Sequence, residues 1–136
     1  MTSTNGLPAD AAAITHCEEV TRREARNFYY GLRILPEPQR SALYCIYAWM
    51  RRADDIADDD SNRDGASDEL EQFRLETLEA FGSGDDFEHE QPMWRAFAAT
   101  VRRFQLEVSP FNDMIDGQRA DLSFVQPEKM EDVVEY

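Results

Sequence analysis

The stretch from Pro36 to Asp60, PEPQRSALYCIYAWMRRADDIADDD, constrains the fold more than any other part of the chain. Pro36 and Pro38 mark a turn and a helix start, because proline lacks an amide hydrogen and is tolerated in the first helical turn. From Gln39 onward, no proline or glycine interrupts the chain until the polar residues that follow the acidic run. The sequence therefore predicts one long helix from Gln39 to Asp60.

One stripe of this predicted helix carries an aromatic side chain, a cation and two carboxylates. Tyr47, Arg51, Asp54 and Asp58 fall at i, i+4, i+7 and i+11, with Asp55 on the flank. Acidic runs are often only solvated surface, yet carboxylates are unfavourable at a helix C-terminus, which favours cations. A bound divalent cation would compensate the charge. Mg²⁺ fits best because it accepts one or two carboxylates together with substrate phosphate oxygens.

The same residues resemble a known family. IYAWMRRADDIADD is similar to the first aspartate-rich motif of the squalene and phytoene synthases, and NFYYGLRILPEPQRSALY is similar to their N-terminal signature. SPFNDMIDGQRADL resembles the phytoene synthase branch, in which PF, DMI, G, R and DL occur in this order. The resemblance implies an all-α helical bundle of the isoprenoid-synthase type, and the head-to-head condensation of two prenyl diphosphates.

The resemblance also assigns roles to residues. It implies that Asp54 and Asp58, with Asp55 in support, bind Mg²⁺, and that Asp54 and Asp58 act in catalysis with Tyr47. Arg51 would contact phosphate oxygens, and Asp55 is grouped with it among the substrate-binding residues. Phe28, Tyr30 and Tyr47 would line the substrate tunnel. Since residues 28–30 are all aromatic, they cannot all face one core. The family often carries small hydroxyl residues before these aromatics, whereas this chain has Arg26 and Asn27.

A second aspartate-rich motif, which the family places on a later helix, is not found in these 136 residues. Family members are also considerably longer. We therefore expect residues 1–9 to be a flexible lead and residues 10–136 to be the N-terminal part of a single all-helical domain. We also expect the natural protein to continue, and this chain alone to bind metal and diphosphate weakly.

Charge is distributed unevenly along the chain. The formal net charge is −14, so charge does not indicate a nucleic-acid partner. Residues 1–52 contain 7 Lys or Arg and 5 Asp or Glu, whereas residues 53–136 contain 7 and 23. Because the sign changes at the aspartate motif, a diphosphate would meet basic residues on one side and require metal on the other.

The cysteines and the apolar segments indicate where in the cell the protein is located. Cys17 and Cys45 lack CxxC spacing and are expected to be reduced core residues, which predicts a cytoplasmic protein. The longest apolar run, residues 42–50, is too short to cross a bilayer, and the first residues do not form a signal peptide. A peripheral contact with a membrane is the alternative location, because the expected product is strongly apolar and must enter a membrane.

Four further helices are expected from apolar periodicity and capping residues. The Asp116–Arg119 pair in the last of them would be a surface ion pair or would reach the substrate pocket, and Gly117 would allow a helix or ligand to approach closely. The expected ranges are 10–35, 68–81, 93–106 and 109–122, with a further helix start at 127–136.

These observations lead to one preferred function and two alternatives. The preferred function is the Mg²⁺-dependent conversion of geranylgeranyl diphosphate to phytoene through a cyclopropyl diphosphate intermediate, in carotenoid biosynthesis. The first alternative is the conversion of farnesyl diphosphate to presqualene diphosphate and squalene, although squalene formation needs a nicotinamide and no glycine-rich dinucleotide motif is visible. The second is a truncated, non-catalytic helical module that binds a partner chain.

Overall fold

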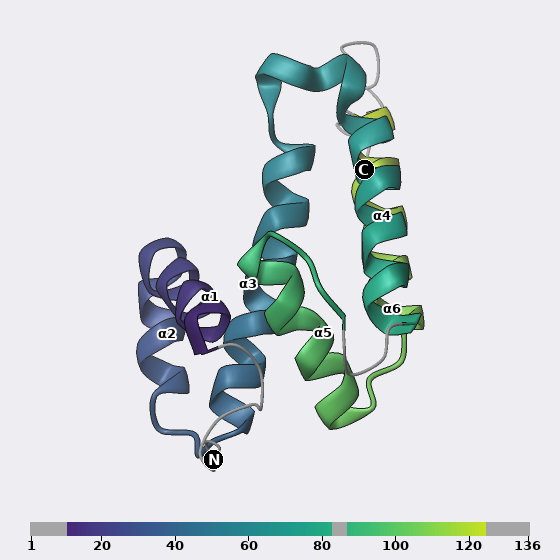
Figure 1. Cartoon of the computed structure of the whole chain (residues 1–136). Coiled ribbons are helices and arrows are strands. Elements are labelled where there is room, and N and C mark those ends of the chain that lie inside the picture. Colours follow the sequence, from purple (N-terminus) through teal and green to yellow (C-terminus); the bar gives the residue numbers. More distant parts are fainter. Residues whose placement is uncertain (1–10, 83–86, 125–136) are drawn as a thin grey trace.

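The computed structural model describes residues 11–82 and 87–124 (Figure 1). In these ranges the chain forms six α-helices and one 3-10 helix, and no strand is present, which confirms the predicted all-α class. The predicted lead at 1–9 and the predicted helix start at 127–136 lie outside the described residues. The elements are α1 (Ala11–Glu24), α2 (Arg26–Leu32), α3 (Gln39–Ala57), η1 (Asp60–Gly65), α4 (Ala66–Gly82), α5 (Pro92–Phe104) and α6 (Ser109–Phe124).

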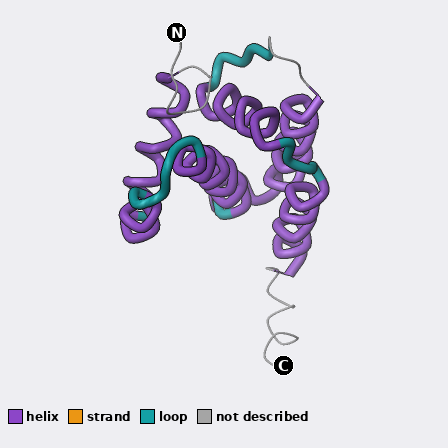
Figure 2. The backbone as a smooth tube through the Cα atoms, turned by 90° about the horizontal axis from the view of Figure 1, so that it is seen from below, coloured by secondary structure: helices purple, strands orange, loops and turns teal. Residues whose placement is uncertain are grey.

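Helix α3 is the central element of the bundle. It packs against α1, α4, α5 and α6. The chain leaves the end of α3 through η1 and returns along α4, and α6 lies beside α4 (Figures 1 and 2). No described helix has the length and apolar character that a membrane crossing requires.

Trp49 on α3 lies at the centre of the core and is completely buried. Its ring centroid lies 5.1 Å from that of Phe73 on α4, 5.8 Å from Phe97 on α5 and 4.9 Å from Phe111 on α6. The indole Nε1 donates a hydrogen bond to the Thr77 hydroxyl at 3.0 Å. One side chain therefore joins four helices, and aromatic pairs at these distances contribute beyond the area that they bury.

The helix predicted over residues 10–35 is in fact two helices. The backbone breaks at Ala25, whose φ of −145° and ψ of 65° are not helical. Because of this break, α2 folds back so that Tyr29 stacks on Tyr44 and donates a hydrogen bond to Glu18 on α1 at 2.9 Å. In one straight helix, residues 18 and 29 would be separated by about 16 Å along the axis. The long-range contacts of Tyr29 thus exclude the single helix.

Helix α3 begins at Gln39, as predicted, but ends at Ala57 rather than Asp60. At its start, the Glu37 carboxylate accepts hydrogen bonds from the Ser41 amide at 3.0 Å and from the Ser41 hydroxyl at 2.8 Å, and an acid is favourable there. At its end, consecutive aspartates oppose the helix dipole, and the chain continues as the 3-10 helix η1.

The buried face of α4 includes Leu70 and Phe73, whereas Leu75 and Leu78 are exposed. Gly117 faces open space, because a Cβ atom added there would meet nothing within 4 Å. Close approach of a described neighbour therefore does not explain this glycine. The cysteines agree with expectation, because Cys17 and Cys45 are both buried and free.

The hydrogen bond between Trp49 and Thr77 provides a test of the core. We expect Thr77→Val to lower the free energy of unfolding by about 1–3 kcal/mol, because it leaves the buried indole N–H without an acceptor. Thr21→Val is the matched control: this equally buried hydroxyl donates to the Cys17 carbonyl of its own helix, so no buried donor is orphaned. Urea denaturation measures both variants, and equal losses would contradict the role given to Thr77.

Candidate functional site

The predicted stripe of functional residues is present on α3. Tyr47, Arg51 and Asp54 lie within the helix, and Asp58 is the first residue beyond it. The Asp58 amide donates a hydrogen bond to the Asp54 carbonyl at 2.8 Å, so the helical turn continues through Asp58 although its own dihedrals are no longer helical. The two carboxylates therefore retain the one-turn separation that the sequence predicted.

Helix α2 supplies aromatic side chains beside this stripe. The ring of Phe28 lies 5.8 Å from that of Tyr47, and Phe28 is 46% exposed. Tyr29 is buried in the core, whereas Tyr30 is 51% exposed. The three aromatics thus diverge as the sequence required. Tyr30 packs against Tyr29 and Arg33, so the structure brings Phe28 and Tyr47 together but does not place Tyr30 with them.

Arg51 is held between two carboxylates. Its Nε lies 3.1 Å from Asp55 on the next turn of α3, and its Nη2 lies 3.6 Å from Glu24 at the end of α1. The nearby Asp55 carboxylate, and then that of Glu24, raise the pKa of Arg51. Sequence reasoning included Asp55 but missed Glu24, because the contact depends on how α1 crosses α3.

Asp54 is held from the opposite side of α3. The Gln118 side chain on α6 donates a hydrogen bond from Nε2 to Asp54 Oδ1 at 2.5 Å. Gln118 lies in a polar run of α6, but nothing local in the sequence distinguishes it from its neighbours. An amide donor at this position orients one carboxylate oxygen, and the remaining lone pairs stay available to a ligand.

The predicted surface pair of Asp116 and Arg119 does not form. Both side chains instead contact α4, where Arg74 donates to Asp116 and Glu71 accepts from Arg119 at 2.8 Å. Glu71 also accepts from Arg74 at 2.9 Å, so one carboxylate connects the two cations. These residues fasten α6 to α4, and neither Asp116 nor Arg119 reaches Asp54.

A cleft of about 170 Å³ lies beside Arg51, between α1, α3 and the start of α5. Its basic groups outnumber its acidic groups. Burial, followed by the charges of Arg23 and Arg52, lowers the pKa of His16. Because three arginines and only two carboxylates line the cleft, it favours an anionic ligand. Its lining residues are His16, Val20, Arg23, Glu24, Ala48, Arg51, Arg52, Asp55 and Met93.

The described residues contain no group of three or more His, Cys, Asp or Glu side chains that could hold a metal. Asp54 and Asp58 therefore offer at most a partial coordination shell. Mg²⁺ suits such a site, because it keeps several waters and is commonly bound by one or two carboxylates plus substrate phosphates. The donors present fit a magnesium ion that binds together with a diphosphate.

These features define an all-helical bundle with an aspartate motif at the end of its central helix. Residues 21–136 match the family model described as squalene/phytoene synthase, and the chain belongs to that family. It is similar to 15-cis-phytoene synthase of Synechococcus elongatus, with 34% identity over 132 residues, and to phytoene synthase of Mycobacterium tuberculosis, with 34% identity over 119 residues.

A solved structure agrees with the family. The crystal structure of a dehydrosqualene synthase in complex with ligand superposes on 93% of this chain with a TM-score of 0.71 and 32% identity. The two sequence matches include 96% and 88% of this chain, but only 41% and 37% of those relatives. The match to the solved structure includes 42% of that chain. It therefore spans about two fifths of the length of these proteins.

The contact between Gln118 and Asp54 allows the metal site to be strengthened. We expect Gln118→Glu to enlarge the rise in melting temperature that Mg²⁺ produces, because a further carboxylate would then face Asp54. Without Mg²⁺ the variant should melt below the parent chain, because two carboxylates would repel. Gln72→Glu makes the same charge change on the exposed surface of α4. An equal response of both variants would contradict a metal site at Asp54.

Proposed function

We propose that this chain is the N-terminal part of a Mg²⁺-dependent prenyltransferase that condenses two prenyl diphosphates head to head. The observation that carries this proposal is the stripe of Tyr47, Arg51, Asp54 and Asp58 on the central helix, beside the exposed ring of Phe28. The family, and relatives that are named phytoene synthases, support the same reaction class. Residues 10–136 would form one part of a single helical domain.

Each group has a chemical task in this proposal. Asp54 and Asp58 would hold Mg²⁺, which stabilises the negative charge of a departing diphosphate. Arg51 would contact phosphate oxygens once they displace the Glu24 or Asp55 carboxylate. These contacts lie at the acidic end of α3. The rings of Phe28 and Tyr47, which we call the aromatic wall, would then contact the prenyl chains.

The aromatic wall would protect and stabilise the reacting carbon. The electron-rich faces of Phe28 and Tyr47, whose rings lie 5.8 Å apart, would attract positive charge and would cover the reacting carbon on that side once substrate is bound. Tyr30 would extend this wall toward the surface, although its ring does not contact Tyr47 in the structure. A carbocation formed at this wall would lie beside Tyr47, which we propose acts in catalysis.

For the substrate we propose geranylgeranyl diphosphate, which would give phytoene through a cyclopropyl diphosphate intermediate in carotenoid biosynthesis. The two phytoene synthase relatives support this choice. Farnesyl diphosphate is the second candidate, and the likeness to a dehydrosqualene synthase favours it. Incubation of the full-length protein with each diphosphate, followed by chromatography of the hydrocarbon products, distinguishes the two.

The metal site is tested by binding, which does not require turnover. We expect Asp54→Asn and Asp58→Asn each to abolish the Mg²⁺-dependent part of inorganic diphosphate binding measured by isothermal titration calorimetry, because a two-carboxylate site loses one ligand. Asp64→Asn, at an exposed position in η1, removes the same charge and should bind as the parent chain does. Unchanged binding in all three variants would favour the non-catalytic binding module.

His16 reports on the cleft beside Arg51. Its pKa is lowered by burial and by Arg23 and Arg52, so its neutral form is favoured. We expect inorganic diphosphate with Mg²⁺ to raise the pKa of His16, because the bound anion would offset both cations. NMR titration of the ring protons measures this shift, with His89 as the internal control, since the chain contains only two histidines. If His16 and His89 shifted equally, the cleft would not be the diphosphate site.

A further inference from the structure

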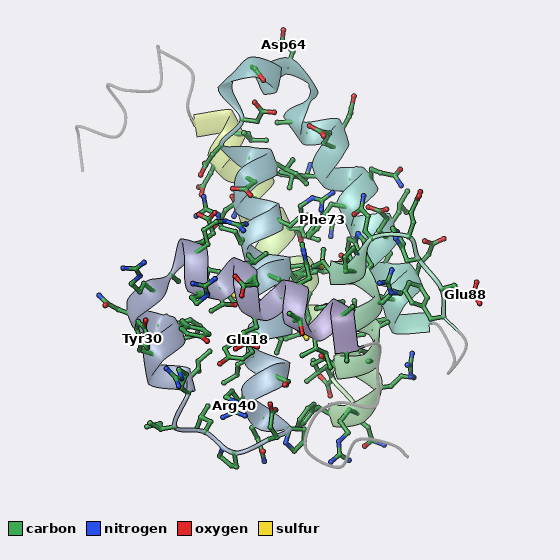
Figure 3. All side chains as sticks on the ribbon, turned by 60° about the vertical axis from the view of Figure 1, so that its left-hand side comes forward. Glu18, Tyr30, Arg40, Asp64, Phe73 and Glu88 are labelled. Carbon is green, nitrogen blue, oxygen red and sulfur yellow. The ribbon has the colours of Figure 1, made fainter. Side chains whose placement is uncertain are left out.

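A second cavity, of about 240 Å³, lies between α1, α2 and the start of α3. It shares no lining residue with the cleft beside Arg51, which lies along the second half of α3. Glu18 on α1 and Arg40 on α3, both labelled in Figure 3, line it from different helices. We call this space the polar cavity, because its lining residues are all charged residues or tyrosines: Glu18, Tyr29, Arg33, Glu37, Arg40 and Tyr44.

Two of these residues, Glu37 and Arg40, neutralise each other. Arg40 donates a hydrogen bond from Nη2 to the Glu37 carboxylate at 3.1 Å, and another from Nη1 to the Arg33 carbonyl at 3.3 Å. The amide and the hydroxyl of Ser41 donate to the same Glu37 carboxylate at 3.0 and 2.8 Å. The charges of Glu37 and Arg40 are therefore already compensated, and this pair forms a fixed side of the polar cavity.

The Tyr44 hydroxyl, by contrast, is without a partner. Tyr44 is only 3% exposed, yet its hydroxyl forms no hydrogen bond with any residue that the structure describes. The ring is held by stacking on Tyr29, with 5.6 Å between the ring centroids. Burial, followed by the charge of Glu18, raises the pKa of Tyr44, so the phenol stays protonated and can donate. Because buried polar groups normally have partners, this hydroxyl points to an occupant of the polar cavity.

Two charges in the polar cavity are also uncompensated. The Glu18 carboxylate accepts a hydrogen bond from the Tyr29 hydroxyl at 2.9 Å, but it forms no ion pair with a described cation. The guanidinium carbon of Arg33 lies 5.9 Å from the centre of the Tyr30 ring, and Arg33 likewise forms no ion pair within the described part of the chain. One anion from α1 and one cation from the end of α2 are therefore available to a ligand.

These two charges decide the class of ligand. An anion alone would be attracted by Arg33 but repelled by Glu18, and a cation alone would be repelled by Arg33. A neutral molecule would satisfy the Tyr44 hydroxyl but would leave both charges without a counter-charge. A molecule that carries both signs of charge satisfies all three groups.

We propose that the polar cavity binds a small zwitterion of the α-amino acid class. Its carboxylate would accept hydrogen bonds from the Tyr44 hydroxyl and the Arg33 guanidinium, and its ammonium group would donate to Glu18. The cavity is far larger than one ordered water needs, which leaves room for a short side chain beside these two groups. The ligand would contact α1, α3 and the end of α2, and would stabilise their arrangement by binding only the folded chain.

Glycine tests the need for both charges, because two molecules of similar size each lack one of them. Acetate has no ammonium group, and methylammonium has no carboxylate. At constant ionic strength, we expect glycine to shift the NMR signals of the Tyr29 and Tyr44 rings in a saturable way. Acetate and methylammonium should each bind at least about ten-fold more weakly, because each loses a charge-assisted hydrogen bond.

A pair of tyrosine variants locates the carboxylate of the ligand. Tyr44→Phe removes the hydroxyl but keeps the ring that stacks on Tyr29, and should weaken glycine binding about ten-fold. Tyr30→Phe removes a hydroxyl from a side chain that is 51% exposed and does not line the cavity. This control should bind glycine as the parent chain does.

A pair of glutamate variants locates the ammonium group. Glu18→Gln should weaken glycine binding about ten-fold without weakening acetate binding, because it removes only the partner of the ammonium group. Glu19→Gln makes the same change at the next position, where the side chain is half-exposed and lies outside the cavity, and should leave glycine binding unchanged. Circular dichroism should show equal helicity in all four variants.

Three outcomes would overturn the proposal. Acetate binding as tight as glycine binding would make the polar cavity an anion site, and the absence of a saturable shift with glycine would leave the cavity to ordered water. Equal weakening by Tyr44→Phe and Tyr30→Phe would place glycine outside the cavity. None of these measurements uses Mg²⁺ or diphosphate, so failure here leaves the proposed prenyltransferase activity unaffected.

Discussion

The burial of Trp49 determines the geometry of the candidate site. Its ring contacts aromatic side chains of α4, α5 and α6, and its indole N–H has an acceptor, so the rotation of α3 about its own axis is fixed. Residues two positions away on a helix point in nearly opposite directions, because each residue turns the helix by about 100°. Tyr47 and Arg51 therefore point away from the core because Trp49 points into it, and Asp54 and Asp58 extend the same stripe.

The flanking helices refine this stripe through polar contacts. Helix α1 contributes Glu24 to Arg51, and α6 contributes Gln118 to Asp54. Helix α6 is itself anchored on α4, because Glu71 accepts hydrogen bonds from both Arg74 and Arg119. The position of the amide at Asp54 thus depends on a charged network on another helix. A single charge change in that network would therefore alter the position of the Gln118 amide at Asp54, although the changed residue does not contact the aspartate motif.

The sequence predicted helices well where local signals agreed. Prolines and the absence of breakers located the start of α3, and apolar periodicity identified α4, α5 and α6 within a few residues of their observed limits. It failed at Ala25, where no proline or glycine marks the break, because the break is imposed by contacts of Tyr29 with Glu18 and Tyr44. Apolar residue type alone also does not decide which face a neighbouring helix covers, since Leu75 and Leu78 of α4 are exposed.

By itself, the sequence determined the all-α class, the family resemblance and the spacing that places Tyr47, Arg51, Asp54 and Asp58 on one stripe, since these depend on residue order and helical periodicity. The tertiary structure alone decided which side chains meet that stripe. Phe28, Glu24 and Gln118 come from three other helices, and their arrival depends on a backbone break and on helix crossings. Such contacts between distant segments are fixed by packing of the whole core, which no local pattern encodes.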